Sequence, residues 1–100
     1  MSVLVTGIVR GDTDAFRRYV SDNPDVLERI SMDARSKGCL HHRFGVGDGF
    51  VVVIDEWETA EGFHDFFANN ADVPTVMREA GAQGQPEFTF AEAIATADEF

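Results

Sequence analysis

The three histidines and single tryptophan of this 100-residue sequence are the side chains best suited to chemistry on a small molecule. His42 alternates with Leu40 and Phe44 within residues 39–46, so these three side chains are expected to share one face of a strand. Apolar surroundings favour the neutral form of histidine, and a neutral imidazole can act as a general base. The alternative is a structural histidine in the core or at an interface.

His64 is a second candidate base, in a predicted helix directly after Phe63. It would either reach a pocket beside Trp57 or lie on the solvated face of the helix with Glu61 and Asp65. Polar residues that flank an apolar helical stripe usually face water, which favours the second interpretation.

Trp57 ends an apolar segment at a point where a helix must pack. Its indole would either wall a pocket and donate a hydrogen bond to a ligand, or serve as a large core anchor. The acidic residues near it are most simply interpreted as a solvated strand end and first helical turn, where carboxylates suit the helix dipole. These residues are Asp55, Glu56, Glu58 and Glu61.

The remaining reactive side chains indicate neither a metal site nor a thiol nucleophile. His41 and His42 are adjacent in a predicted strand and point to opposite faces, so they cannot chelate one metal together. No His-Glu-x-x-His or paired Cys-x-x-Cys spacing is present, and we expect no metal. Cys39 would need a base and an electropositive setting to act as a nucleophile, with His41 the nearest base. The alternative is a small buried hydrophobe.

The elements that position these residues follow from hydrophobic periodicity. Residues 3–9 are rich in β-branched side chains and predict a strand. A helical region capped by Asp12 or Thr13 extends to Gly38, with a break near residues 21–23, because Asn23-Pro24 is typical of a new helix start. Residues 39–46 and 50–57 predict a hairpin through a turn at residues 47–49.

The second half of the chain repeats the order of helix and strand. Thr59 is expected to cap a helix to about Asn69, and Asp72 a short continuation to Gly81. Phe88, Phe90 and Ile94 indicate a final strand. The order β-α-β-β-α-β predicts a ferredoxin-like α+β sandwich with a four-stranded antiparallel sheet.

One side of this sheet needs a partner. If one side of the sheet were uncovered, apolar strand residues would be exposed to solvent. The candidates are Val5, Val9, Val52, Ile54, Phe88 and Phe90. A monomer rarely exposes so large an apolar patch. We therefore expect a homodimer formed sheet against sheet.

Composition limits the other partners. Eight Lys and Arg oppose eighteen Asp and Glu, and a net charge of −10 repels phosphate backbones and anionic lipids. Neither nucleic acid nor a membrane is an expected partner. The single cysteine cannot form an intrachain disulfide, and the N-terminus lacks a signal-peptide pattern, so we expect a cytoplasmic protein. One domain is predicted over residues 1–100, with residues 95–100 as a loosely held tail.

Three segments carry a resemblance to a known family. They are Lys-Gly-Cys-Leu at residues 37–40, the segment from Val51 through Glu56-Trp57-Glu58-Thr59 to Phe63, and Pro-Glu-Phe at residues 86–88. The chain resembles the antibiotic biosynthesis monooxygenase-like proteins of the dimeric α+β barrel superfamily. This resemblance implies a homodimer whose two sheets form a barrel, with an apolar pocket between the sheet and the helices of each protomer.

The resemblance also implies an activity. Some relatives oxygenate polycyclic aromatic hydroquinones or anthrones without metal, flavin or haem, and we expect a cofactor-independent monooxygenase for a small aromatic or quinol-like substrate. His42 or His64 would be the base, and Trp57 and Phe44 would wall the pocket. Phe63 and Phe67 would form its floor.

The sequence is also compatible with two other functions. A non-catalytic dimer of the same fold would bind a small apolar ligand. A haem-degrading protein is disfavoured, because that branch of the family uses an Asn in the first strand and a His ten residues after Trp57, where this chain has Phe67.

Overall fold

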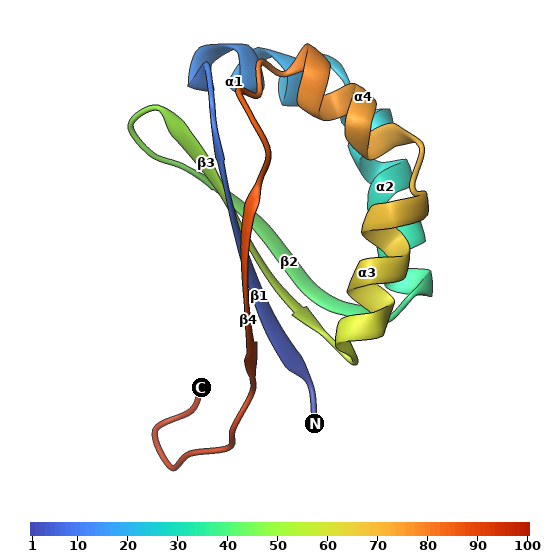
Figure 1. Cartoon of the computed structure of the whole chain (residues 1–100), viewed down its shortest axis with the longest axis vertical. Coiled ribbons are helices and arrows are strands. Elements are labelled where there is room, and N and C mark those ends of the chain that lie inside the picture. The colour runs from blue at the N-terminus through green and yellow to red at the C-terminus, as the bar shows by residue number, and fades with distance from the viewer.

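Four helices cover one face of a four-stranded antiparallel sheet in the computed structural model, which describes residues 1–100 (Figure 1). The strands are β1 (Val3–Arg10), β2 (Cys39–Val46), β3 (Phe50–Trp57) and β4 (Glu87–Glu92), in the order β2-β3-β1-β4. The helices are α1 (Thr13–Asp22), α2 (Pro24–Ser36), α3 (Ala60–Asn69) and α4 (Asp72–Glu79). The ferredoxin-like α+β fold is thereby confirmed, with each helical region divided into two helices.

The break between α1 and α2 lies at the predicted Asn23-Pro24 pair. Asp12 caps α1, since its side chain accepts hydrogen bonds from the backbone N–H groups of Asp14 and Ala15. Asn23 occupies the N-cap position of α2 with Pro24 at its first turn, as the sequence indicates, but its side chain makes no capping hydrogen bond to α2. Its side-chain amide instead donates to the carbonyl of Tyr19 at 3.0 Å, so it closes α1 and leaves Pro24 to begin α2.

Two capping interactions hold α3 and α4. Thr59 caps α3 as predicted and accepts the N–H of Gly62 at 3.0 Å. Asp72 was expected to cap α4, but Asn70 takes that role and accepts the N–H groups of Asp72 and Val73. The Asn70 amide also donates to Asp33 on α2 at 2.7 Å, and this hydrogen bond lowers the pKa of Asp33.

The β2–β3 hairpin sets the register of the site. Gly49 in its turn has a φ of 78°, a backbone conformation that favours glycine. Beyond the turn, His42 pairs with Asp55 and Phe44 with Val53. A bulge between Cys39 and His41 leaves Leu40 without a partner in β3. The prediction that Leu40 shares a face of the strand with His42 is therefore wrong, because the extra residue shifts the alternation. Cys39 is buried there, whereas Leu40 is 46% exposed.

The face of the sheet away from the helices is open (Figure 1). Val52 and Ile54 were expected on it and lie in open-face positions, with Leu4 and Ile8 beside them in β1. Ile54 is 55% exposed. The other four residues named for a bare side face the helices instead, as burial, cavity lining or ring contacts with α3 indicate. They are Val5, Val9, Phe88 and Phe90.

The interior on the helical side is divided into two small clusters. One is centred on Trp57, with Val5, Ala34, Cys39, Phe63 and Phe66. The other joins α1 to α4 and contains Phe16, Tyr19, Val76 and Ala80. Only 12 of the 100 residues are buried, and the space between the two clusters is a cavity. None of the four helices combines the length and the hydrophobicity that crossing a membrane requires.

Candidate functional site

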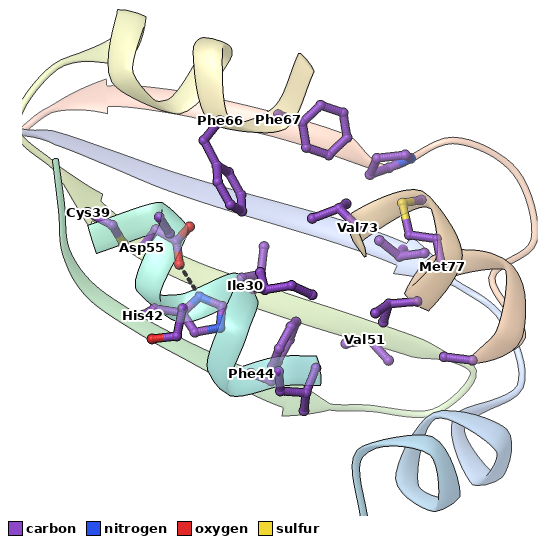
Figure 2. Close-up of a pocket in the computed structure, with 18 of the residues that line it drawn as sticks. Ile30, Cys39, His42, Phe44, Val51, Asp55, Phe66, Phe67, Val73 and Met77 are labelled. Atoms are coloured by element: carbon purple, nitrogen blue, oxygen red, sulfur yellow. Dashed lines mark hydrogen bonds and ion pairs between the residues drawn. The ribbon is translucent and has the colours of Figure 1, made fainter. Parts of the chain in front are cut away.

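A cavity of about 480 Å³ lies between the sheet and the helices (Figure 2). Small-molecule sites commonly have volumes of roughly 300–1,000 Å³, so the cavity is large enough for a ligand. Most of its lining is apolar and comes from strands and helices on several sides. These residues include Val9, Val51 and Val53 from the sheet, Leu27 and Ile30 from α2, and Val73, Val76 and Met77 from α4.

A hydrogen-bonded chain of three side chains interrupts this apolar lining. His42 Nδ1 lies 2.7 Å from Asp55 Oδ1, an interaction that Figure 2 shows on the cavity wall. Trp57 Nε1 donates to the other carboxylate oxygen, Asp55 Oδ2, at 3.0 Å. The hairpin register places His42 opposite Asp55, and Trp57 follows two residues later on the same face of β3.

This chain of hydrogen bonds determines which nitrogen of His42 is free. Asp55 is 7% exposed, and its carboxylate is satisfied by two donors. An ionised Asp55 requires the proton of a neutral His42 to be on Nδ1, which leaves the lone pair on Nε2. The His42 side chain is 42% exposed and therefore lies at the rim of the cavity rather than in its depth. A carboxylate that orients an imidazole in this way is a recurring general-base arrangement.

Trp57 is a core anchor that also walls the cavity. Its side chain is fully buried in the core and also lines the cavity. Its ring contacts Phe63 and Phe66 at centroid distances of 5.5 Å each. The indole N–H is already taken by Asp55, so the indole positions the carboxylate rather than offering that hydrogen bond to a ligand.

The three phenylalanines expected in the pocket all line the cavity. Phe44 meets His42 edge-on at 4.7 Å between ring centroids and Phe16 of α1 at 5.2 Å. Phe63 and Phe67 stack at 5.8 Å with an interplanar angle of 14°. The structure therefore brings His42, Phe44, Trp57, Phe63 and Phe67 to one cavity.

His64 lies apart from this group. Its side chain is exposed and does not line the cavity. Its ring contacts those of Phe63 and Phe90, at centroid distances of 5.7 and 5.1 Å. The geometry favours the surface interpretation of His64 and leaves His42 as the candidate base.

Cys39 has the environment of a small buried hydrophobe. Burial, and secondarily the charge of Asp55, raise the pKa of the Cys39 thiol to about 11. Its Sγ lies 3.4 Å from the carbonyl oxygen of His41, which cannot act as a base toward it. The thiol therefore remains protonated near neutral pH and is a poor nucleophile.

Asp55 is the functional candidate that the sequence analysis placed wrongly. It was assigned to a solvated acidic run, yet it is the one charged residue buried in the structure. Strand alternation carried the missing signal, because Val51, Val53, Asp55 and Trp57 occupy every second position. No group of three or more His, Cys, Asp or Glu side chains is placed to hold a metal ion.

Comparison with solved structures shows which fold surrounds this cavity. The cofactor-independent oxygenase SnoaB from Streptomyces nogalater is 20% identical, with 98% of this chain and 97% of that chain covered and a TM-score of 0.62. A monooxygenase from the gene ActVA-Orf6 of Streptomyces coelicolor, in complex with the ligand Nanaomycin D, is 15% identical, with 99% and 93% covered and a TM-score of 0.71. A structure of an antibiotic biosynthesis monooxygenase is 16% identical, with 93% and 99% covered and a TM-score of 0.65.

The chain thus has the fold of antibiotic biosynthesis monooxygenase structures over nearly its whole length, which confirms at the level of the fold the resemblance noted in its sequence. No protein-family model matches the sequence, and no curated protein matches it. Because a shared fold hosts many reactions, the function has to be argued from the cavity itself.

Proposed function

We propose that this protein is a cofactor-independent monooxygenase for a small aromatic or quinol-like substrate. The observation that carries the proposal is the His42–Asp55 pair on the wall of an apolar cavity of about 480 Å³. A buried carboxylate and an oriented imidazole supply a base, and the apolar walls supply a place for a planar ring. The solved structures that share the fold include one described as a cofactor-independent oxygenase and two described as monooxygenases, which supports the same conclusion.

The proposed reaction requires only a base and an apolar cavity from the protein. His42 Nε2 would accept a proton from an acidic ring position, such as the methylene carbon of an anthrone, and leave an electron-rich carbanion in the cavity. The carbanion itself reduces dioxygen, so that one oxygen atom enters the ring as a ketone and the other leaves as water. The methylene group loses both its hydrogens in this exchange, and no further reductant is needed. Exclusion of bulk water protects the reactive intermediates.

Oxygen uptake tests this proposal directly. Chelator-treated protein is mixed with a panel of anthrones and hydroquinones, and oxygen consumption is followed together with the absorbance of the quinone product. We expect uptake well above the rate of autoxidation in buffer, with one dioxygen consumed per anthrone oxidised. Uptake indistinguishable from buffer across the whole panel would refute the assignment.

The same cavity also supports a second function. An apolar cavity of this size can bind a ligand without transforming it, which is the property of a non-catalytic ligand-binding protein. Saturable binding of the panel compounds without oxygen uptake would establish this second function in place of the first.

We further propose that two copies associate through the open faces of their sheets. Leu4 and Ile54 are 43% and 55% exposed on that face, with Ile8 and Val52 beside them, and a solved structure with the same fold is described as a dimeric ferredoxin-like protein. In sedimentation velocity runs at micromolar concentration the protein should behave as a dimer. Ile54→Glu places one unpaired carboxylate from each copy in the interface and should raise the dissociation constant about 100-fold or more.

A matched control keeps this test specific to the sheet. Met32 on α2 is a similarly exposed apolar residue, at 67%, on the helical side of the molecule. Met32→Glu should leave the dimer intact. A monomeric wild-type protein, or equal weakening by both substitutions, would contradict dimerisation through this face.

A further inference from the structure

Arg35 is the only Arg or Lys that lines the cavity, and it has no carboxylate partner. The other cations of α2 and its C-terminus are engaged. Arg29 makes two hydrogen bonds of 2.8 Å with Asp72, and Lys37 lies 3.3 Å from Asp33. In a chain with a net charge of −10, a guanidinium left unpaired at a cavity is suited to an anion from outside the protein.

The position of Arg35 in α2 places it near the opening of the cavity. Leu27, Ser31 and Arg35 follow one another at four-residue spacing, which aligns them along one side of the helix, and all three line the cavity. Ser31 and Arg35 are exposed. They therefore lie where the cavity meets solvent rather than in its depth.

The edge strand β2 lies beside α2 and also lines the cavity. Its only neighbour in the sheet is β3. His42 and Phe44, which Figure 2 shows beside α2, are 42% and 44% exposed, so this side of the cavity is reached by solvent. The free cation and the candidate base thus belong to the same, partly exposed side of an otherwise apolar cavity.

We infer that Arg35 binds a carboxylate carried by the aromatic substrate and so sets both the class and the orientation of that substrate. This inference rests on the proposed function. A charged group is costly to bury among apolar side chains, so an acidic ligand would place its ring inside and keep its carboxylate at the opening. A guanidinium binds a carboxylate with two parallel hydrogen bonds, which fixes direction as well as position.

The two carboxylates that line the cavity already have hydrogen-bond donors within the protein, so neither occupies Arg35. Asp55 is buried and satisfied by donors from His42 and Trp57. Asp12, the other acidic lining residue, caps α1 and accepts two backbone N–H groups. Arg35 is thus the lining group with unused capacity to bind an anion, and a carboxylate held there would leave the ring of the ligand to enter the apolar cavity that His42 also lines.

A pair of nearly isosteric probes tests the inference. Anthracene-2-carboxylate and anthracene-2-carboxamide differ mainly in charge, and both absorb where tryptophan emits. Trp57 is the only tryptophan and lines the cavity, so quenching of its emission reports binding there. We expect the carboxylate to bind about tenfold more tightly or better at low ionic strength, and the preference to shrink as salt is added.

Variants assign that preference to one side chain. Arg35→Gln should make the two probes bind equally, and Arg35→Lys should keep part of the preference because it keeps the charge. Arg29→Gln, on the same helix but outside the cavity lining, should leave the preference unchanged.

The outcomes separate this inference from the proposed function. Equal binding of the two probes by the wild-type protein, or a carboxylate preference that survives in Arg35→Gln, would overturn the role of Arg35 and leave the monooxygenase proposal standing. Quenching by neither probe would count against both.

Discussion

Substitution of His42 by alanine is expected to lower the rate of substrate-dependent oxygen uptake by about 10²- to 10⁴-fold, the usual contribution of a positioned general base. His42 is the imidazole of the cavity wall, and its Nδ1 is held by Asp55 at 2.7 Å. Ligand binding should change little, because the rest of the apolar lining remains. The measurement is kcat and KM for oxygen uptake, with Trp57 quenching as an independent measure of binding.

The other two histidines serve as controls for this substitution. His41 is adjacent in β2 and borders the cavity, but it pairs with Glu56 rather than with Asp55. His64 lies on α3 and does not line the cavity. His41→Ala and His64→Ala should each keep nearly full activity. Added imidazole should restore part of the activity of His42→Ala, since it can enter the space that the ring vacates. Full activity in His42→Ala, or an equal loss in all three variants, would remove His42 from the mechanism.

The Trp57→Phe variant should lower the free energy of unfolding by about 2–4 kcal/mol, which is a large effect for a change that keeps an aromatic ring. The substitution removes the indole N–H that donates to Asp55 Oδ2 at 3.0 Å and leaves a buried carboxylate oxygen without its donor. It also leaves part of a fully buried volume empty. Chemical denaturation followed by circular dichroism measures the change.

A second substitution separates the lost hydrogen bond from the lost volume. Adding Asp55→Asn to Trp57→Phe removes the orphaned charge and should restore about 1 kcal/mol of stability. Phe66→Leu, in the same core cluster but without a hydrogen bond to Asp55, should cost only about 1 kcal/mol. If Trp57→Phe costs no more than Phe66→Leu, the indole N–H has no stabilising role.

The fold followed largely from local signals. Strand periodicity, the turn at residues 47–49 and the Asn23-Pro24 break each act over a few residues, and each lies where it was expected. The capping residues of α2 and α4 were less predictable. Asn23 and Asn70 each bond backbone groups two to four residues away. Several such groups lie within reach of a short polar side chain, so the local sequence allows more than one hydrogen bond.

The candidate site was predictable in its aromatic residues but not in its polar centre. Large apolar side chains on the predicted inner faces were expected between the sheet and the helices, and the cavity lies there. Phe44, Phe63 and Phe67 all line it. The burial of Asp55 depends on donors from two other residues, His42 across the hairpin and Trp57 along the strand. Composition and charge alone place a carboxylate in water, because only specific partners make its burial tolerable.

Few residues are buried around the large apolar cavity, so ligand binding is expected to affect the stability of this protein. A molecule with an apolar ring, once seated there, contributes the contacts that a conventional interior would obtain from its own side chains. Occupancy and resistance to unfolding are then thermodynamically linked, because a ligand that binds only the native chain shifts the equilibrium toward it. A substrate of the proposed class would therefore complete the hydrophobic core while it is bound.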